Sequence, residues 1–164
     1  MKNFFKKFSK KTKNNESYKN IILPKIKKFQ ESIKDNDAIS FLHYGHLGDI
    51  INSLPVIKEL SKTKKCFLYI QKNKKIPEHV VSKDHPFGEI YLSEKAINKM
   101  LPLLQSQKFI EKVEIYNNQE INIDLNFFRE LPINFNIDSV RWYSHLTGKF
   151  PDLSKNYKEV PNHE

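Results

Sequence analysis

The chain has 164 residues, which is enough for one domain with a real hydrophobic core and a short extra segment but too few for two full domains. Its one cysteine, Cys66, excludes an intrachain disulfide and a cysteine-based zinc site. No apolar run reaches the ~20 residues of a membrane span, and the amino-terminal segment lacks the apolar core of a signal peptide. We therefore expect a cytoplasmic protein.

The net charge of +9 is concentrated at the amino-terminal end of the chain. Residues 1–28 contain ten lysines and one glutamate, which leaves 18 basic and 18 acidic residues in the remainder. Only Arg129 and Arg141 are arginines, whereas recognition of nucleic acids generally favours arginine. The composition therefore argues against a nucleic-acid partner.

The first 13 residues form a cationic segment in which Phe4, Phe5 and Phe8 would share one side of a helix. Such a segment can lie on an anionic membrane surface, and a solvated tail explains it equally well. We treat residues 1–23 as a basic amphipathic or disordered arm. If residues 1–28 do bind anionic lipid, the protein is peripheral on the inner face of the cell membrane.

The next segments predict a strand, a helix and a second strand. A helix is expected over residues 24–35, because Ile26, Phe29 and Ile33 have helical spacing. The apolar run 38–43 suits a buried parallel strand, and so does the run 66–71. Between them we expect a helix that Asp49 caps, with a kink or a restart at Pro55. Strand, helix and strand of these lengths form a right-handed βαβ unit.

The rest of the chain continues the alternation of helices and strands. Residues 72–92 are expected to be irregular, and Ser93 is expected to cap a helix with a buried stripe formed by Ala96, Ile97, Met100, Leu101 and Leu104. Further strands are expected at 112–116 and 121–128, and a last helix at 138–146 that Gly148 stops. The predicted fold is α/β, a Rossmann-like, open, mostly parallel sheet with flanking helices over residues 24–150. Residues 151–164 are expected to be a connector.

The corner "HYGHLGD" lies where the first strand ends, which is where ligands bind in open α/β sheets. His43, His46 and Asp49 are evenly spaced and resemble a metal triad. They belong to a strand, a loop and a helix start, however, so even spacing does not give them a common face. We therefore expect no metal here.

A dinucleotide-binding loop is a second interpretation of this corner. Gly45 and Gly48 would be the second and third glycines of G-x-G-x-x-G, but His43 occupies the first position. The second strand also ends in Gln71-Lys72, without the carboxylate that holds a ribose hydroxyl. In the simplest interpretation the glycines permit unusual backbone angles and a close helix approach, while Asp49 only caps. A carboxylate facing a cleft there can also act as a general base.

The stretch "GHLGDIINSLPVIKEL", residues 45–60, resembles the G-x-x-G-D-x-x-x-x-L-P-x-x-x-x-L pattern of the family nine glycosyltransferases, which include the lipopolysaccharide heptosyltransferases. The similarity spans residues 38–72, and "IDL" at 123–125 and "HLTG" at 145–148 are similar to later stretches of some members. The resemblance implies one half of a GT-B fold. In this fold two Rossmann-like halves face each other, the first binding the acceptor and the second the nucleotide-sugar, for inverting transfer without a metal.

The resemblance also assigns residues. It makes Asp49 the catalytic base, places Gly45, His46 and Gly48 beside the acceptor and the reacting carbon, and puts Asn52 one turn along. It implies a cell-surface glycan or lipopolysaccharide acceptor, and a nucleotide-sugar as co-substrate with no cofactor. The chain would be the acceptor-binding half alone, so we expect negligible transfer without a donor-binding half.

Two further interpretations complete the predictions. The alternative to an enzyme half is a non-enzymatic dinucleotide-binding or membrane-associated α/β binding module. Arg141 and Trp142 together would suit a sugar or a phosphate, but a core-anchoring tryptophan beside a surface arginine is the favoured interpretation.

Overall fold

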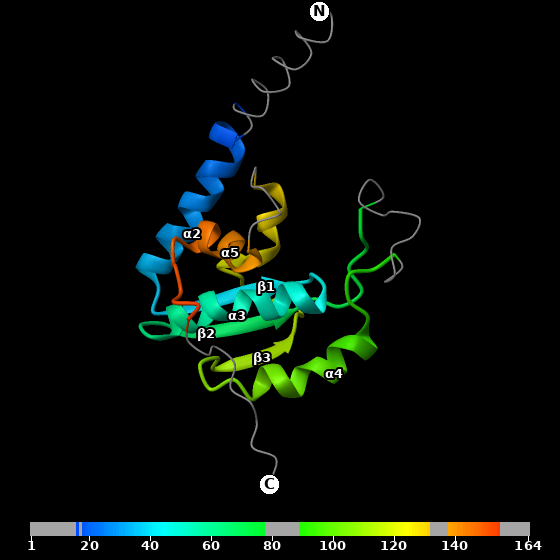
Figure 1. The fold of residues 1–164 in the computed structure, drawn as a ribbon. Helices are drawn as coiled ribbons and strands as arrows, with labels where there is room; N and C mark the ends of the chain where they lie inside the picture. Colours follow the sequence, from blue (N-terminus) through cyan, green and yellow to red (C-terminus); the bar gives the residue numbers. More distant parts are fainter. Residues whose placement is uncertain (1–15, 17, 78–88, 132–137, 155–164) are drawn as a thin grey trace, which may run out of the picture.

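A computed structural model of the chain describes residue 16 and residues 18–77, 89–131 and 138–154 (Figure 1). Most of the expected amino-terminal arm lies outside the described residues. The first described helical segment is a π-helical turn, η1, that runs directly into α2. The elements are η1 (Tyr18–Ile22), α2 (Leu23–Asp35), β1 (Ala38–His43), α3 (Leu47–Ser61), β2 (Lys65–Ile70), α4 (Glu94–Gln105), β3 (Lys112–Ile115), β4 (Ile123–Asp124), η2 (Leu125–Glu130) and α5 (Ser139–Thr147).

The four strands form one sheet in the order β3-β2-β1-β4, and every pair is parallel. This confirms the predicted α/β fold with a Rossmann-like open sheet. Parallel pairing aligns the carboxyl ends of the strands at one edge, so β1 and β4 deliver the residues that follow them to the same place. None of the described helices is long and apolar enough to cross a membrane.

Burial alternates along β1 and β2, so one face of the sheet carries the core. Ile39, Phe41 and His43 of β1 are completely buried, and Ser40 and Leu42, which point the other way, are half-buried. On the buried face α3 lies over the strands (Figure 1), and the Cys66 Sγ contacts the carbonyl oxygen of Ile57 at 3.7 Å. Burial raises the pKa of the Cys66 thiol to about 12.

The predicted helices form close to their expected bounds. Ser93 caps α4 by accepting a hydrogen bond from the Ala96 amide at 3.3 Å, and Asp138 caps α5 by accepting one from the Val140 amide at 3.0 Å. Gly148 ends α5 with φ of 69°, the left-handed conformation that glycine adopts without strain. Helix α5 packs against both α2 and α3 and joins these helices into one layer.

Two local predictions are wrong, and a third is settled only in part. Helix α3 begins at Leu47, so Asp49 is its third residue and completes a capping box with His46, which is the N-cap residue. Of the kink or restart expected at Pro55, the restart is absent, because the helix continues through this residue. The strand expected at 121–128 is limited to Ile123–Asp124, and a 3-10 helix follows. The reason is that the Asp124 carboxylate accepts hydrogen bonds from the Asn126 amide at 2.9 Å and its side chain at 2.7 Å, which stabilises a turn in place of an extended ladder.

Two predictions fall partly outside the described residues. In the segment expected to be irregular, residues 72–77 and 89–92 contain an isolated bridge between Lys75 and Ile90 and no helix, and residues 78–88 are not described. Residues 149–154 form neither helix nor strand, as expected for a connector, and its last ten residues lie outside the description.

Candidate functional site

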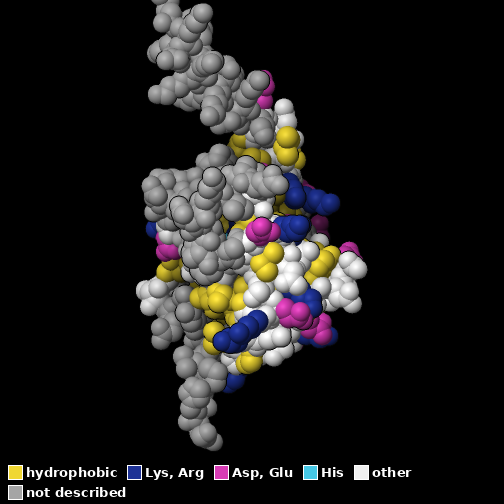
Figure 2. All heavy atoms as spheres, turned by 90° about the vertical axis from the view of Figure 1, so that its right-hand side faces the viewer, with side chains coloured by type: hydrophobic (Ala, Val, Ile, Leu, Met, Phe, Trp, Pro, Cys, Tyr) yellow, Lys and Arg dark blue, Asp and Glu magenta, His cyan; other side chains and the backbone are white. Residues whose placement is uncertain are grey.

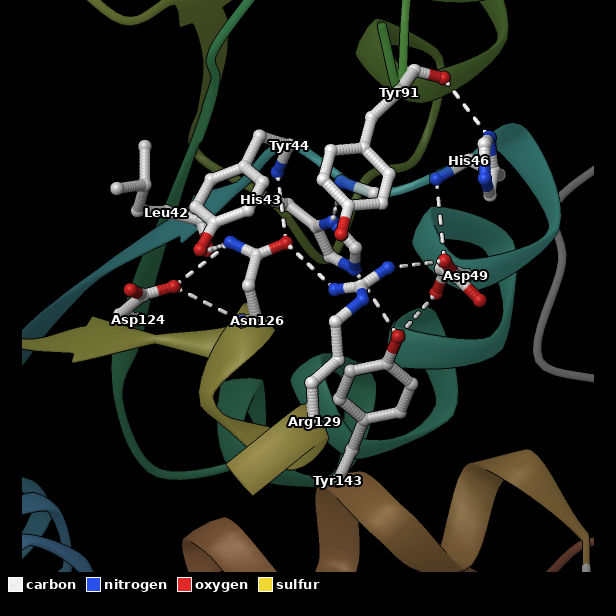
Figure 3. Close-up of polar contacts among 11 residues, drawn as sticks. Leu42, His43, Tyr44, His46, Asp49, Tyr91, Asp124, Asn126, Arg129 and Tyr143 are labelled. Carbon is white, nitrogen blue, oxygen red and sulfur yellow. Dashed lines mark hydrogen bonds and ion pairs between the residues drawn. The ribbon is translucent and has the colours of Figure 1, made fainter. Parts of the chain in front are cut away.

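Asp49 lies in the first turn of α3, where the chain leaves β1 at the carboxyl edge of the sheet (Figure 3). Its Oδ2 accepts a hydrogen bond from the backbone amide of His46 at 3.2 Å and forms an ion pair with Arg129 Nη2 at 2.7 Å. The second oxygen, Oδ1, has no hydrogen-bond partner among the residues described. Within the described part of the chain, the carboxylate is thus fixed through Oδ2 alone.

Arg129 comes from η2, which follows β4, and reaches Asp49 because β4 pairs with β1. Its guanidinium carbon lies 4.8 Å from the ring centroid of Tyr91 and 4.4 Å from that of Phe128, within the range of cation–π contacts. Its Nη1 also donates to Asn126 Oδ1 at 3.4 Å. The side chains of Arg129 and Asp49 are 24% and 21% exposed, so the pair is largely shielded from water yet reachable.

His43 is buried beneath Asp49, and its hydrogen bonds define its tautomer. The Gly45 amide donates to Nδ1 at 3.0 Å, so Nδ1 carries no proton and Nε2 donates to the Tyr143 hydroxyl at 3.1 Å. That hydroxyl in turn donates to the carbonyl oxygen of Asp49 at 2.8 Å. Burial, with a smaller contribution from the nearby Arg129 charge, lowers the pKa of His43 to about 3. His43 is therefore a neutral structural link between β1, α3 and α5.

His46 faces a different partner. Its Nδ1 lies 3.0 Å from the carbonyl oxygen of Tyr91, which can only accept, so Nδ1 is the donor. The rings of His46 and Tyr91 meet edge to face, with centroids 5.3 Å apart. The rings of His43 and His46 thus point to separate partners, and the described residues contain no group of three metal-ligating side chains.

Gly45 and Gly48 have different roles, and neither has a positive φ. A Cβ at Gly45 would lie 2.8 Å from Asp49 Oδ2 and 2.9 Å from Arg129 Nη2, whereas a Cβ at Gly48 would meet nothing within 4 Å. The unusual backbone angles expected at both glycines are therefore absent. Of these two glycines, only Gly45 is closely approached by other side chains.

This difference predicts opposite effects of the same substitution. Gly45→Ala is expected to lower the free energy of unfolding by about 1–3 kcal/mol, because the Asp49–Arg129 pair must move. Gly48→Ala, the matched control, is expected to raise it by up to about 1 kcal/mol, since alanine favours a helix and meets open space. Urea unfolding of both variants measures this, and equal effects at the two positions would contradict the geometry.

Asn52 lies one helical turn after Asp49, as predicted, and is half-buried. Sequence reasoning missed Arg129, Asn126, Tyr91 and Tyr143; the one signal was that Arg129 is one of only two arginines in the chain. Arg141 and Trp142 fit the interpretation of a surface arginine beside a core-anchoring tryptophan. Arg141 is exposed, and the Trp142 ring stacks on that of Phe128 with centroids 5.0 Å apart.

Figure 2 shows the side of the molecule on which the strands end, where cationic and anionic side chains lie beside one another among hydrophobic ones. The Lys72–Glu94 ion pair, at 2.7 Å, belongs to this edge because Lys72 follows β2. Comparison of the chain with protein-family models, with curated proteins and with solved structures found no match in any of the three.

Proposed function

We propose that this chain is the acceptor-binding half of an inverting, metal-independent glycosyltransferase in which Asp49 is the general base. The observation that carries the proposal is the half-held carboxylate. Asp49 Oδ2 is fixed by His46 and Arg129, and Oδ1 is left without a hydrogen-bond partner among the described residues. The similarity of residues 45–60 to the family nine pattern supports the same role.

In the proposed reaction an acceptor hydroxyl donates its proton to Asp49 Oδ1 while its oxygen forms a bond to the anomeric carbon of the donor sugar. The bond from that carbon to the diphosphate breaks on the opposite face, and the nucleoside diphosphate leaves with the electron pair. The sugar carbon carries oxocarbenium-like charge in between, by analogy with glycoside hydrolysis. Donor binding belongs to a second half in the family that the chain resembles.

The site residues then take distinct roles. His46 and Arg129 keep the carboxylate in one orientation, which matters because general-base catalysis depends on geometry before pKa. Gly48 leaves open space at the start of α3, where an acceptor can approach the backbone. The His43–Tyr143 link holds the Asp49 backbone from below.

A glycan array probed with the purified chain tests acceptor binding. We expect binding to a subset of glycans and none to NAD by calorimetry. Saturable NAD binding would favour the dinucleotide-binding alternative, and liposome binding that is lost with residues 1–28 and indifferent to Asp49 would favour a membrane module. Failure to bind any glycan would contradict the proposal.

Transfer itself is tested by adding a separately produced donor-binding half of a family nine enzyme, with nucleotide-sugars labelled in the sugar. We expect transfer only when both halves are present, and a fall of about 10²–10⁴-fold for Asp49→Asn, the usual contribution of a general base. Asp35→Asn, which changes an exposed carboxylate at the end of α2, is the matched control. Equal rates for Asp49→Asn and the control would remove Asp49 from the mechanism.

A further inference from the structure

A cavity of about 400 Å³ lies between the η1–α2 segment, the residues that follow β1 and β4, and η2. This volume falls in the range of roughly 300–1,000 Å³ that is usual for small-molecule sites. Its polar lining includes Tyr44, Asp124, Asn126 and Glu130, and its apolar lining includes Ile22 and Phe127. The ends of β1 and β4 therefore border a hollow that is separate from Asp49.

The cavity is connected to the site through Asn126, which is 2% exposed. Asn126 Oδ1 accepts hydrogen bonds from the Tyr44 amide at 3.0 Å and from Arg129 at 3.4 Å, and Arg129 continues to Asp49. Figure 3 shows Asp124 and Asn126 on one side of Arg129 and Asp49 on the other. A ligand in the cavity would thus contact Asn126, which among the described residues is linked to Asp49 through Arg129 alone.

The described lining of the cavity carries one more negative than positive charge, which disfavours anions. Asp124 and Glu130 contribute two carboxylates, and Lys25 is the one cation that lines it. The Lys25 ammonium lies over the ring of Phe127, 4.3 Å from the centroid, so it is already placed against an aromatic face. A phosphate or carboxylate in this hollow would meet like charge at short range.

The hydrogen-bonding groups of the cavity suit hydroxyls. Asp124 Oδ1 is occupied by Asn126, whereas Oδ2 and the Glu130 carboxylate have no hydrogen-bond partner among the described residues. The Tyr44 hydroxyl also has no hydrogen-bond partner among the described residues. Burial, together with the nearby Asp124 charge, raises the pKa of Tyr44 to about 12, so its hydroxyl stays a neutral donor. Two acceptors, one donor and the apolar surface of Ile22 match the hydroxyls and C–H face of a sugar.

We infer that this cavity is a subsite for an uncharged, hydroxyl-rich sugar unit of the acceptor, and that it discriminates against phosphorylated or carboxylated sugars. The inference rests on the proposed function and deepens it by naming the class of acceptor. It makes Tyr44 and Glu130 specificity-determining residues, separate from Asp49.

The test uses methyl glycosides of glucose, galactose and mannose and the matching 6-phosphates, titrated into the isotopically labelled chain at low salt. We expect at least one neutral glycoside to shift the amide signals of Tyr44, Asn126 and Glu130 with millimolar affinity, and its 6-phosphate to bind at least tenfold more weakly. Salt should narrow that difference. Phosphates that bind equally well or better, or no glycoside that shifts these amides, would overturn the inference.

Variants make the assignment specific. Tyr44→Phe is expected to weaken binding of the neutral glycoside about fivefold, the effect of one lost hydrogen bond. Glu130→Gln is expected to reduce the ratio between the affinities for the neutral glycoside and for its 6-phosphate. Glu120→Gln, which changes an exposed carboxylate lining a groove on the other face of the sheet, is the matched control and should change neither quantity.

The two proposals can fail separately. Glycoside binding that depends on Tyr44, together with transfer that is insensitive to Asp49→Asn, would retain the subsite and reject the catalytic role. Transfer that depends on Asp49, with acceptor affinity unchanged by Tyr44→Phe and Glu130→Gln, would reject the subsite alone.

Discussion

Lowering the pH from 6.5 towards 3 is expected to destabilise the folded chain through His43 by about 1.4 kcal/mol per pH unit. The folded state keeps this ring neutral until its pKa of about 3, whereas the unfolded chain binds the proton near pH 6.5. Between these values the unfolded state holds more protons, so the free energy of unfolding falls as the pH falls. The full loss, reached below pH 3, is about 5 kcal/mol, the product of this slope and the pKa shift of His43 from 6.5 to about 3.

The physical cause is that a second ring proton has nowhere to go. Nδ1 already accepts from the Gly45 amide, so protonating it sets two donors against each other inside a buried space. Protonation would also place a charge near Arg129, which is one of the causes of the low pKa. Acid should therefore loosen the corner that holds Asp49.

The measurement is urea unfolding at several pH values for the wild type, His43→Asn and His145→Asn. Carboxylates contribute to the pH dependence of the free energy of unfolding in all three proteins. The part of the slope that is lost only in His43→Asn therefore reports the His43 ring. His145 is exposed and serves as the control. Should His43→Asn fail to fold, nitrogen NMR of the wild-type ring gives the same answer: a neutral Nε2–H tautomer is expected down to about pH 4, and titration near pH 6.5 would contradict the prediction.

Much of this fold could be predicted because its signals are local. The apolar runs of β1 and β2, the cap Ser93 and the helix stop Gly148 each lie within a few residues of the structure they specify. The strand predicted over residues 121–128 was too long. Its residues favour strands, but a single carboxylate, Asp124, turns the backbone after a strand of two residues.

The candidate site was predictable only in part, for a topological reason. Asp49 belongs to a recognisable corner, but its partners Arg129 and Tyr143 are 80 and 94 residues away along the chain. They meet Asp49 because β4 adds to β1 and α5 packs on α3. No local pattern in the sequence encodes that pairing.

The Asp49–Arg129 pair is expected to show a coupling free energy of about 1–3 kcal/mol in a double-mutant cycle of Asp49→Asn and Arg129→Met. Exposed ion pairs contribute about 0–1 kcal/mol, but these side chains are only 21% and 24% exposed. Removal of one partner leaves a largely buried charge with reduced compensation. Arg141→Met, which removes an exposed guanidinium, is the control and is expected to change stability by less than about 0.5 kcal/mol.

Arg129→Lys separates charge from geometry in this pair. Lysine keeps the positive charge, but it loses the planar group that lies against Tyr91 and Phe128 and the fork that reaches both Asn126 and Asp49. We expect Arg129→Lys to recover less than half of the stability lost in Arg129→Met. Full recovery would show that charge alone holds Asp49, and a cycle without measurable coupling would show that the His46 amide suffices to position the carboxylate.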